Sequence, residues 1–205
     1  MNTQVINMLD QGVADAAFTC LENGGVVGIP TDTVYGIACK VTDENCIRRL
    51  YKIKERDQLK AIAVLIGSLD QISQLSDQVT PASKKLMNAF WPGALTIIMP
   101  KKPSLPSSLT QYPTVGVRMP AHPWLNELME KTGPLAATSA NISGQPSLAT
   151  AGDVLESLDG RIDLLIDGGR CEGGVASTVV DCTASSLKIL RPGAISEKDI
   201  RAALN

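Results

Sequence analysis

The sequence contains few of the residues that mark nucleic-acid-binding proteins. Aromatic residues make up 3% of the 205 residues, His122 is the single histidine, and the formal net charge is −2. Single-stranded RNA is bound by aromatic stacking and positively charged grooves, and this composition offers little of either. Any polyanion must therefore be met by a few locally placed lysines and arginines, which suits a small phosphate-bearing ligand better than a long nucleic acid.

Long apolar runs are also missing. No stretch of the sequence approaches the roughly 20 apolar residues of a membrane span. The first residues, Met1 to Gln4, carry no cationic side chain ahead of an apolar segment, as a secretory signal would. These absences predict a cytoplasmic protein.

Paired cysteines are absent too. The five cysteines form an odd set without a C-x-x-C pair, which argues against a disulfide framework and against a structural zinc site. We expect them to be small, buried and reduced side chains; they are Cys20, Cys39, Cys46, Cys171 and Cys182.

What the sequence does contain is enough apolar residues for a core. With 44% hydrophobic residues, the chain is expected to form one domain over residues 1–205 that buries roughly 70% of its unfolded surface. We find no internal repeat and no interdomain linker.

Apolar spacing and capping residues predict alternating helices and strands. Helices are expected over residues 5–20, 44–54, 123–131 and 151–158, and after the capping residues Ser68, Thr80 and Ser196. Strands are expected over residues 26–29, 34–38, 61–66, 94–99, 115–119, 135–138, 164–167, 177–181 and 187–190.

This alternation predicts an α/β fold with an open, twisted sheet and flanking helices. The last two strands are joined by residues 183–186 alone. A parallel crossover needs a dozen residues or more, so this pair must be antiparallel and the sheet must be mixed.

Three short polar segments fall where strands or helices end. They are residues 30–36 (PTDTVYG), 54–56 (KER) and 138–141 (TSAN). In α/β proteins, ligands collect at the ends of such elements, where loops present hydroxyl, amide and cationic groups. These segments therefore predict a ligand site.

The cations of the second segment allow two interpretations. Lys54 and Arg56 at a helix end, with Lys60 before the next strand, are either solvated charges near a helix C-terminus or a phosphate clamp. The sequence lacks G-x-x-x-x-G-K-[ST], so a clamp here would not be a P-loop.

Ser139 and Asn141 also allow two interpretations, since they suit either a hydrogen-bonded phosphate or ribose, or a local turn. Arg118 and Arg191 each end a predicted strand. Because the residues before these two arginines look buried, we expect both guanidinium groups to have a function beyond solvation.

Seven motifs, in order along nearly the whole chain, resemble the threonylcarbamoyl-AMP synthases of the YrdC-like family. They are PTDTVYG (30–36), KxR (54–56), WPGxLT (91–96), VRMP (117–120), SANxSGxPS (139–147), STVVD (177–181) and LRPG (190–193). Since the chain stops soon after the last motif, it resembles the short, single-domain members.

The resemblance implies a mixed sheet around a concave cationic pocket, and an enzyme that makes threonylcarbamoyl-AMP and pyrophosphate from L-threonine, bicarbonate or CO2, and ATP for tRNA modification. Mg2+ and a downstream tRNA threonylcarbamoyl transferase are implied as well. Lys54 and Arg56 match the catalytic KxR signature. The implied nucleotide-side positions are Arg56, Lys60, Thr114, Ser139, Asn141, Ser147 and Arg191; the implied threonine-side positions are Thr33, Arg118, Ala137 and Ser177.

The chain departs from the family pattern at Asp57, Ala61 and Leu65, where many members have Pro, Pro and His. Threonine specificity is therefore a weaker expectation than ATP use. His122 fits a turn before a helix, and no residue stands out as a general base. Two alternatives stay open: an RNA-binding module on the same fold, and a paralogue that forms a different carbamoyl or acyl adenylate.

Overall fold

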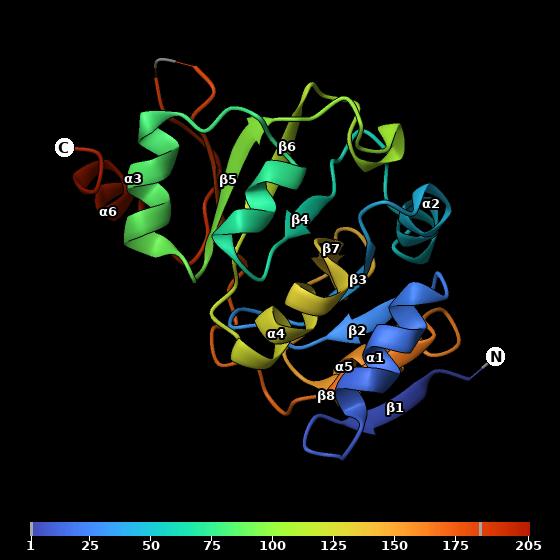
Figure 1. Ribbon diagram of the computed structural model, residues 1–205. Helices are drawn as coiled ribbons and strands as arrows, with labels where there is room; N and C mark the ends of the chain where they lie inside the picture. Colours follow the sequence, from blue (N-terminus) through green and yellow to red (C-terminus); the bar gives the residue numbers. More distant parts are fainter. Residues whose placement is uncertain (1, 185) are drawn as a thin grey trace.

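The structure is a computed structural model that describes residues 2–184 and 186–205 (Figure 1). Met1 and Ser185, which belong to the predicted chain start and to the last predicted connection, lie outside these residues. The strands are β1 (Gln4–Asn7), β2 (Val27–Ile29), β3 (Gly36–Lys40), β4 (Ala63–Leu65), β5 (Leu95–Pro100), β6 (Thr114–Arg118), β7 (Leu135–Ser139), β8 (Leu164–Asp167), β9 (Thr178–Asp181) and β10 (Lys188–Arg191).

Helices connect most of these strands. The α-helices are α1 (Val13–Glu22), α2 (Glu44–Ile53), α3 (Pro81–Phe90), α4 (Pro123–Thr132), α5 (Ala151–Leu158) and α6 (Glu197–Ala202), and the 3-10 helices are η1 (Leu69–Gln74) and η2 (Ser107–Leu109).

The strands form one open sheet in the order β1-β8-β2-β3-β7-β4-β6-β5-β9-β10. Strands β1, β8 and β2 pair in parallel, as do β4 with β6 and β5 with β9, whereas the remaining pairs are antiparallel. The expected mixed sheet and the antiparallel last pair are therefore confirmed. The edge strands β1 and β10 lie toward opposite sides of the molecule, as do the chain ends in Figure 1.

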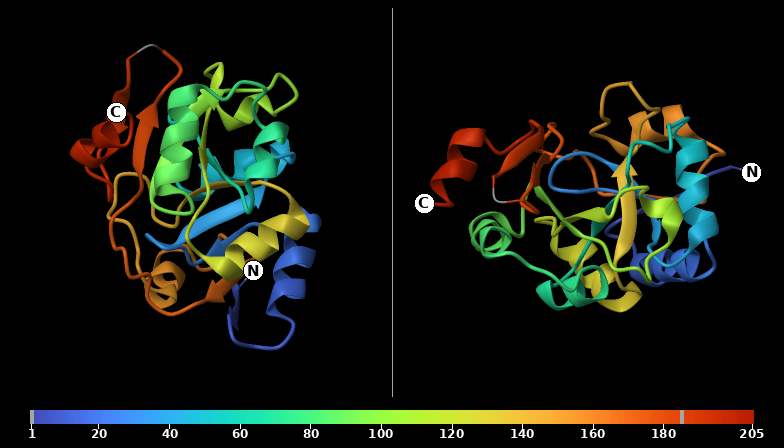
Figure 2. Two further views of the ribbon diagram at one scale, coloured as in Figure 1. Left: turned by 60° about the vertical axis from the view of Figure 1, so that its left-hand side comes forward. Right: turned by 90° about the horizontal axis from the view of Figure 1, so that it is seen from above.

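Two clusters of buried side chains hold the helices on the sheet. One joins α1 and α4, which contact each other, to β2, β7 and β8. The larger cluster gathers apolar side chains from α2, α3, α5 and α6 on strands β3 to β9. The two views of Figure 2 show these helices flanking the sheet on different sides.

Helix starts follow the capping residues in the sequence. The side chains of Asp43, Thr80 and Ser196 accept hydrogen bonds from backbone N–H groups in the first turns of α2, α3 and α6. Pro81 fits the first turn of α3 because that position needs no N–H donor. His122 is the N-cap of α4, and its Nδ1 accepts from Leu125 N at 3.3 Å, which confirms its expected place before a helix.

The predicted first helix was wrong at its start. Val5 and Ile6 lie in strand β1, Leu9 is 89% exposed, and α1 begins only at Val13. The left-handed conformation of Gly12, with φ 81°, separates the two elements. The apolar residues of β1 and of the turn after it happen to recur at helical spacing.

The predicted capping box at Ser68 was also wrong. Ser68 makes no side-chain cap, and the helix that follows is the 3-10 helix η1. The Gln71 side chain accepts from Gly67 N at 2.9 Å and donates to Met129 O at 2.6 Å. Gln71 therefore ties η1 to α4 instead of closing a box.

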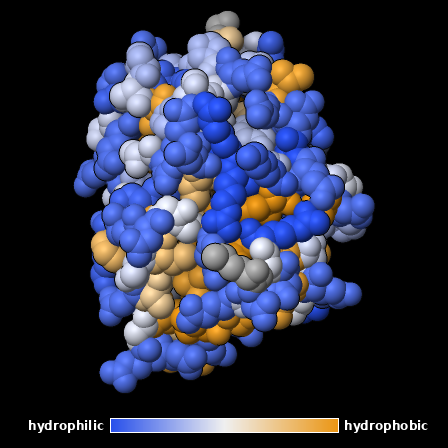
Figure 3. All heavy atoms as spheres, turned by 90° about the vertical axis from the view of Figure 1, so that its right-hand side faces the viewer, coloured by the Kyte–Doolittle hydropathy of each residue, from blue (hydrophilic) through white to orange (hydrophobic). Residues whose placement is uncertain are grey.

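The surface on the side of the molecule that carries α2 is mainly hydrophilic, with hydrophobic atoms in smaller patches (Figure 3). Among the described residues, no helix has both the length and the apolar character needed to cross a bilayer.

Candidate active site

A cavity of about 530 Å³ lies on one face of strands β4, β6, β5 and β9. Alternate residues of these strands line it, because successive side chains of a strand point to opposite faces. In the cross-strand register, Ile98 faces Gly116 on one side and Asp181 on the other. A Cβ atom at Gly116 would lie 3.1 Å from Thr96 Cγ2, so glycine keeps this row of the sheet open.

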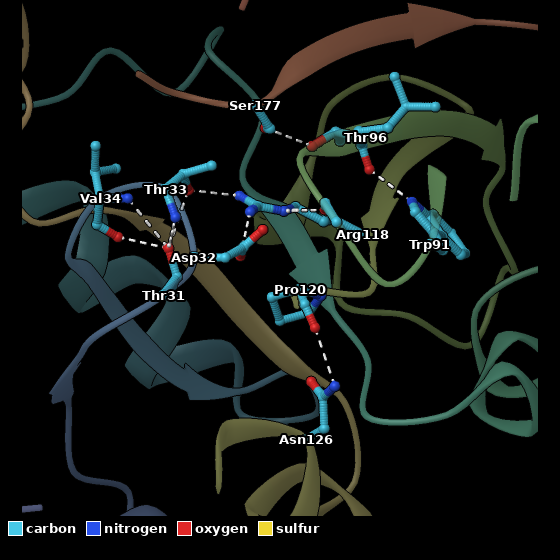
Figure 4. Close-up of polar contacts among 12 residues, drawn as sticks. Thr31, Asp32, Thr33, Val34, Trp91, Thr96, Arg118, Pro120, Asn126 and Ser177 are labelled. Atoms are coloured by element: carbon cyan, nitrogen blue, oxygen red, sulfur yellow. Dashed lines mark hydrogen bonds and ion pairs between the residues drawn. The ribbon is translucent and has the colours of Figure 1, made fainter. Parts of the chain in front are cut away.

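Arg118, at the end of β6, is 6% exposed and donates three hydrogen bonds within the protein (Figure 4). Its Nε lies 2.9 Å from Gly93 O, Nη1 lies 2.9 Å from Thr33 Oγ1, and Nη2 lies 2.6 Å from Asp32 Oδ1. Burial lowers the pKa of Arg118, and the Asp32 carboxylate opposes this effect. The guanidinium group is thus fixed in orientation at the cavity wall.

Thr33 is placed by the turn that follows β2. Thr31 Oγ1 accepts from Thr33 N at 3.1 Å and from Val34 N at 3.2 Å, and it donates to Val34 O at 2.7 Å. The Thr33 hydroxyl therefore lies between Thr31 and Arg118, at the edge of the cavity. These contacts explain why two threonines flank the aspartate of the PTDTVYG segment.

Ser177 and Arg191 meet at the far strands of the sheet. Ser177 Oγ lies 2.8 Å from Thr96 Oγ1 and accepts from Arg191 Nη2 at 3.1 Å; the same nitrogen donates to Ser177 O at 2.7 Å. The expectation that Arg191 follows a buried strand was wrong, because β10 is an exposed edge strand. Its guanidinium nevertheless turns toward Ser177 and lines the cavity.

Arg56 lines the cavity from the loop after α2. Its Nε donates to Lys60 O and its Nη2 to Ala61 O, each at 3.0 Å. Burial lowers the pKa of Arg191, and the nearby positive charges of Arg118 and Arg56 lower it further. The charges of Arg118 and Arg56 therefore both reach Arg191 across this cavity.

The position of Lys54 matches neither of the two interpretations of the sequence. Lys54 is not a solvated charge, since it is 1% exposed, and it is not among the residues that line the cavity. Its ammonium donates to the carbonyl oxygens of Ser139 and Asn141. Burial, and secondarily Arg56, lowers the pKa of Lys54 to about 7.

Eight of the predicted site residues come together in the cavity lining: Thr33, Arg56, Thr114, Arg118, Ala137, Ser139, Ser177 and Arg191. Asn141 is buried beside Lys54, whereas Lys60 and Ser147 are exposed and lie outside the lining. The nucleotide role of Lys60 and Ser147 stays a prediction.

Sequence reasoning missed Asp32, Thr96 and Asp181, which orient Arg118, contact Ser177 and line the cavity respectively. All three stand inside the motifs PTDTVYG, WPGxLT and STVVD, so the signal was present. Tyr35 packs inside the protein, since it is fully buried and its hydroxyl donates to Gly169 O at 2.8 Å.

An open mixed sheet that brings three arginines and several hydroxyl side chains to one cavity defines an α/β protein suited to a small anionic ligand. The family described as Telomere recombination, the Sua5, YciO and YrdC proteins, matches residues 19–193. The chain belongs to this family, which confirms the predicted resemblance.

Relatives at near-full coverage of the chain agree with this assignment. The chain is 38% identical to the threonylcarbamoyl-AMP synthase of Bacillus subtilis over 98% of its own length and 59% of the relative's. It is also 38% identical to the Pyrococcus abyssi enzyme of the same name, over 90% of the chain and 55% of the relative. The chain therefore spans somewhat more than half of these curated relatives.

A solved structure confirms the fold. The crystal structure of Pyrococcus abyssi Sua5 complexed with L-threonine superposes with a TM-score of 0.94 and 36% sequence identity. The match covers 98% of this chain and 61% of the Sua5 chain.

Proposed function

We propose that this protein is an L-threonylcarbamoyladenylate synthase, which forms threonylcarbamoyl-AMP and pyrophosphate from L-threonine, bicarbonate or CO2, and ATP. The observation that carries the proposal is the convergence of Arg56, Arg118 and Arg191 on one cavity that also holds the Thr33 and Ser177 hydroxyls. Both substrates of the central step are anions, so their approach requires fixed positive charge.

We propose that the cavity has two ends, which meet where Arg191 donates to Ser177. The proposed threonine end contains Thr33, Arg118, Ala137 and Ser177, where a guanidinium and two hydroxyls suit a carboxylate and a side-chain hydroxyl. Arg118 donates three hydrogen bonds within the protein, so two of its five N–H groups are left for a carboxylate. The proposed nucleotide end contains Arg56, Thr114, Ser139 and Arg191.

In the proposed reaction, the neutral amine of threonine adds to CO2, which gives a carbamate and releases a proton. A carbamate oxygen then attacks the α-phosphate of ATP, and pyrophosphate leaves. The residues of the cavity position the two anions and offset their repulsion, which lowers the barrier without a covalent enzyme intermediate. Hydrogen bonds hold Arg118 and Arg56 in place before the substrates arrive, so little reorganisation is needed.

Mg2+ would arrive with the triphosphate. Within residues 2–184 and 186–205, no group of three or more His, Cys, Asp or Glu side chains has metal-binding geometry. This fits Mg2+, which keeps several waters and binds mainly substrate phosphates with one or two carboxylates. Asp181 supplies a carboxylate in the lining, and the metal would neutralise charge on the leaving pyrophosphate.

The comparisons support this proposal from a second direction. Relatives that the chain matches over nearly its full length bear the name threonylcarbamoyl-AMP synthase, and the related Sua5 was crystallised with L-threonine. Those relatives are longer than this chain, which matches only part of each. We propose that residues 1–205 form a single domain that carries the synthesis step. A tRNA threonylcarbamoyl transferase would consume the product.

The test is pyrophosphate release from ATP and bicarbonate in the presence of each amino acid in turn, without RNA. We expect release with threonine and little with other amino acids, and the adenylate should be detectable by mass spectrometry. Strict dependence on tRNA, or tight RNA binding without ATP chemistry, would instead support an RNA-binding module. Release with another amino acid or with an acyl donor would indicate a paralogue. This outcome is worth testing because the chain departs from the family pattern at Asp57, Ala61 and Leu65.

A further inference from the structure

Lys54 and Asn141 form a buried polar contact behind the cavity wall. Lys54 lies at the C-terminal end of α2, and its Nζ lies 2.6 Å from Asn141 O and 3.2 Å from Asn141 Oδ1. The same ammonium donates to Ser139 O. Ser139 Oγ lies 3.4 Å from the same nitrogen, so four oxygens surround the three protons of the ammonium.

The loop after β7 is held at further points. Ser143 N donates to Lys54 O at 2.8 Å, so Lys54 binds the loop through its main chain as well. Asn141 Nδ2 donates to Gln145 O at 2.6 Å and to Ile142 O at 2.9 Å, and Asn141 is 6% exposed. Lys54 and Asn141 together therefore join the end of α2 to the loop that follows β7.

Each of these two buried residues stands two positions from a residue that lines the cavity. Arg56 follows Lys54, and Ser139 precedes Asn141. The protons of the Lys54 ammonium are directed to buried oxygens and none is left for a phosphate, whereas Arg56 uses only two of its five N–H groups within the protein. The four residues of KxR and SxN thus separate into an outer pair that faces the cavity and an inner pair that does not.

We propose that Lys54 and Asn141 are positioning residues, which hold Ser139 at the nucleotide end of the cavity and make no contact with the nucleotide themselves. This inference rests on the proposed function, because it assumes that the cavity binds a nucleotide. It assigns the cation of the KxR signature nearest the helix to the protein framework instead of to the triphosphate.

The first experiment measures the dissociation constants of AMP, ADP and ATP for the wild type, Lys54→Gln and Arg56→Ala. If Lys54 is a positioning residue, Lys54→Gln should raise the dissociation constants of all three nucleotides by the same factor. We expect about tenfold, the size of one misplaced hydrogen bond. Arg56→Ala should weaken the binding of ATP more than that of AMP, because the attraction of an arginine for a nucleotide grows with the number of phosphates. Lys52→Gln, an exposed lysine of the same helix, is the matched control and should change none of them.

A double-mutant cycle tests whether Lys54 acts through Ser139. In a Ser139→Ala background, Lys54→Gln should cost little further affinity, because the group that it positions is already gone. Asn141→Ala serves as a second variant if Lys54→Gln folds poorly, and it should show the same uniform loss. Melting curves give the folded fraction, to which each dissociation constant refers.

A loss for Lys54→Gln that increases from AMP to ATP would overturn the inference, as would full additivity with Ser139→Ala. Unchanged affinities in a folded but less stable variant would also overturn it, because Lys54 would then contribute to folding stability only. A wild-type protein that binds none of the three nucleotides would overturn the proposed function and this inference with it. The two failures are therefore distinguishable.

Discussion

Arg118→Lys tests the division of the cavity into a threonine end and a nucleotide end. The substitution keeps a positive charge beside Asp32 but removes the planar fork that reaches Gly93 O, Thr33 Oγ1 and Asp32 Oδ1 together. A lysine at this buried position can satisfy only part of this set. It also cannot offer a carboxylate two parallel N–H groups.

The expected magnitudes follow from these contacts. Losing about two hydrogen bonds of a buried charged group should lower the free energy of unfolding by about 3 kcal/mol. For a domain of this size, that corresponds to a fall in melting temperature of roughly 6–12 °C. Losing the bidentate contact to threonine should weaken its apparent affinity roughly tenfold to hundredfold, with the ATP affinity little changed.

The assay combines thermal melting with the dependence of pyrophosphate release on threonine and ATP concentration. Arg201→Lys is the matched control, because Arg201 is an exposed arginine paired with Glu197, and it should change stability by at most about 0.5 kcal/mol. Unchanged threonine affinity in folded Arg118→Lys would refute the carboxylate assignment. Weak ATP binding with normal threonine binding would show that the two ends are reversed.

Two further predictions concern the loop after α2. Arg56→Ala should lose several kcal/mol of combined binding and transition-state stabilisation but only about 1 kcal/mol of folding stability. Arg48→Ala, at an exposed arginine, is the control and should change turnover little. Unaltered turnover in Arg56→Ala would exclude a phosphate contact. The pKa of Lys54 is lowered from 10.5 to about 7, so between these values the unfolded chain binds a proton that the native protein does not. Urea unfolding should therefore show wild-type stability rising with pH across that window relative to Lys54→Gln, and a constant difference would contradict the lowered pKa of Lys54.

Much of the fold could be predicted because local signals and tertiary packing agree. The caps at Thr80 and Ser196 begin helices as expected, and the short connection after β9 forces an antiparallel pair. The failure at the first helix has a physical reason. Val5 and Ile6 pair with Leu165 and Ile166 of β8, and a pairing over this sequence distance leaves no mark in the local spacing.

The site was predictable as a set of segments, but the roles of its members were not. A lysine and an arginine two residues apart at a helix end look alike in sequence. In the structure, a difference of two positions turns Arg56 toward the cavity and Lys54 toward the carbonyl oxygens of a distant loop. That loop arrives through strand pairing between β3 and β7, which local patterns do not determine.

The same distinction explains why so few polar side chains suffice at this site. Buried groups keep their hydrogen bonds satisfied by one another, as Asp32 does for Arg118 and Asn141 does for Lys54. Each pair also contacts a neighbouring side chain in the cavity lining, the Thr33 hydroxyl in the first case and the Ser139 hydroxyl in the second. Because the framework absorbs the cost of ordering these groups during folding, the cavity can present oriented donors to an anion without ordering them again on binding.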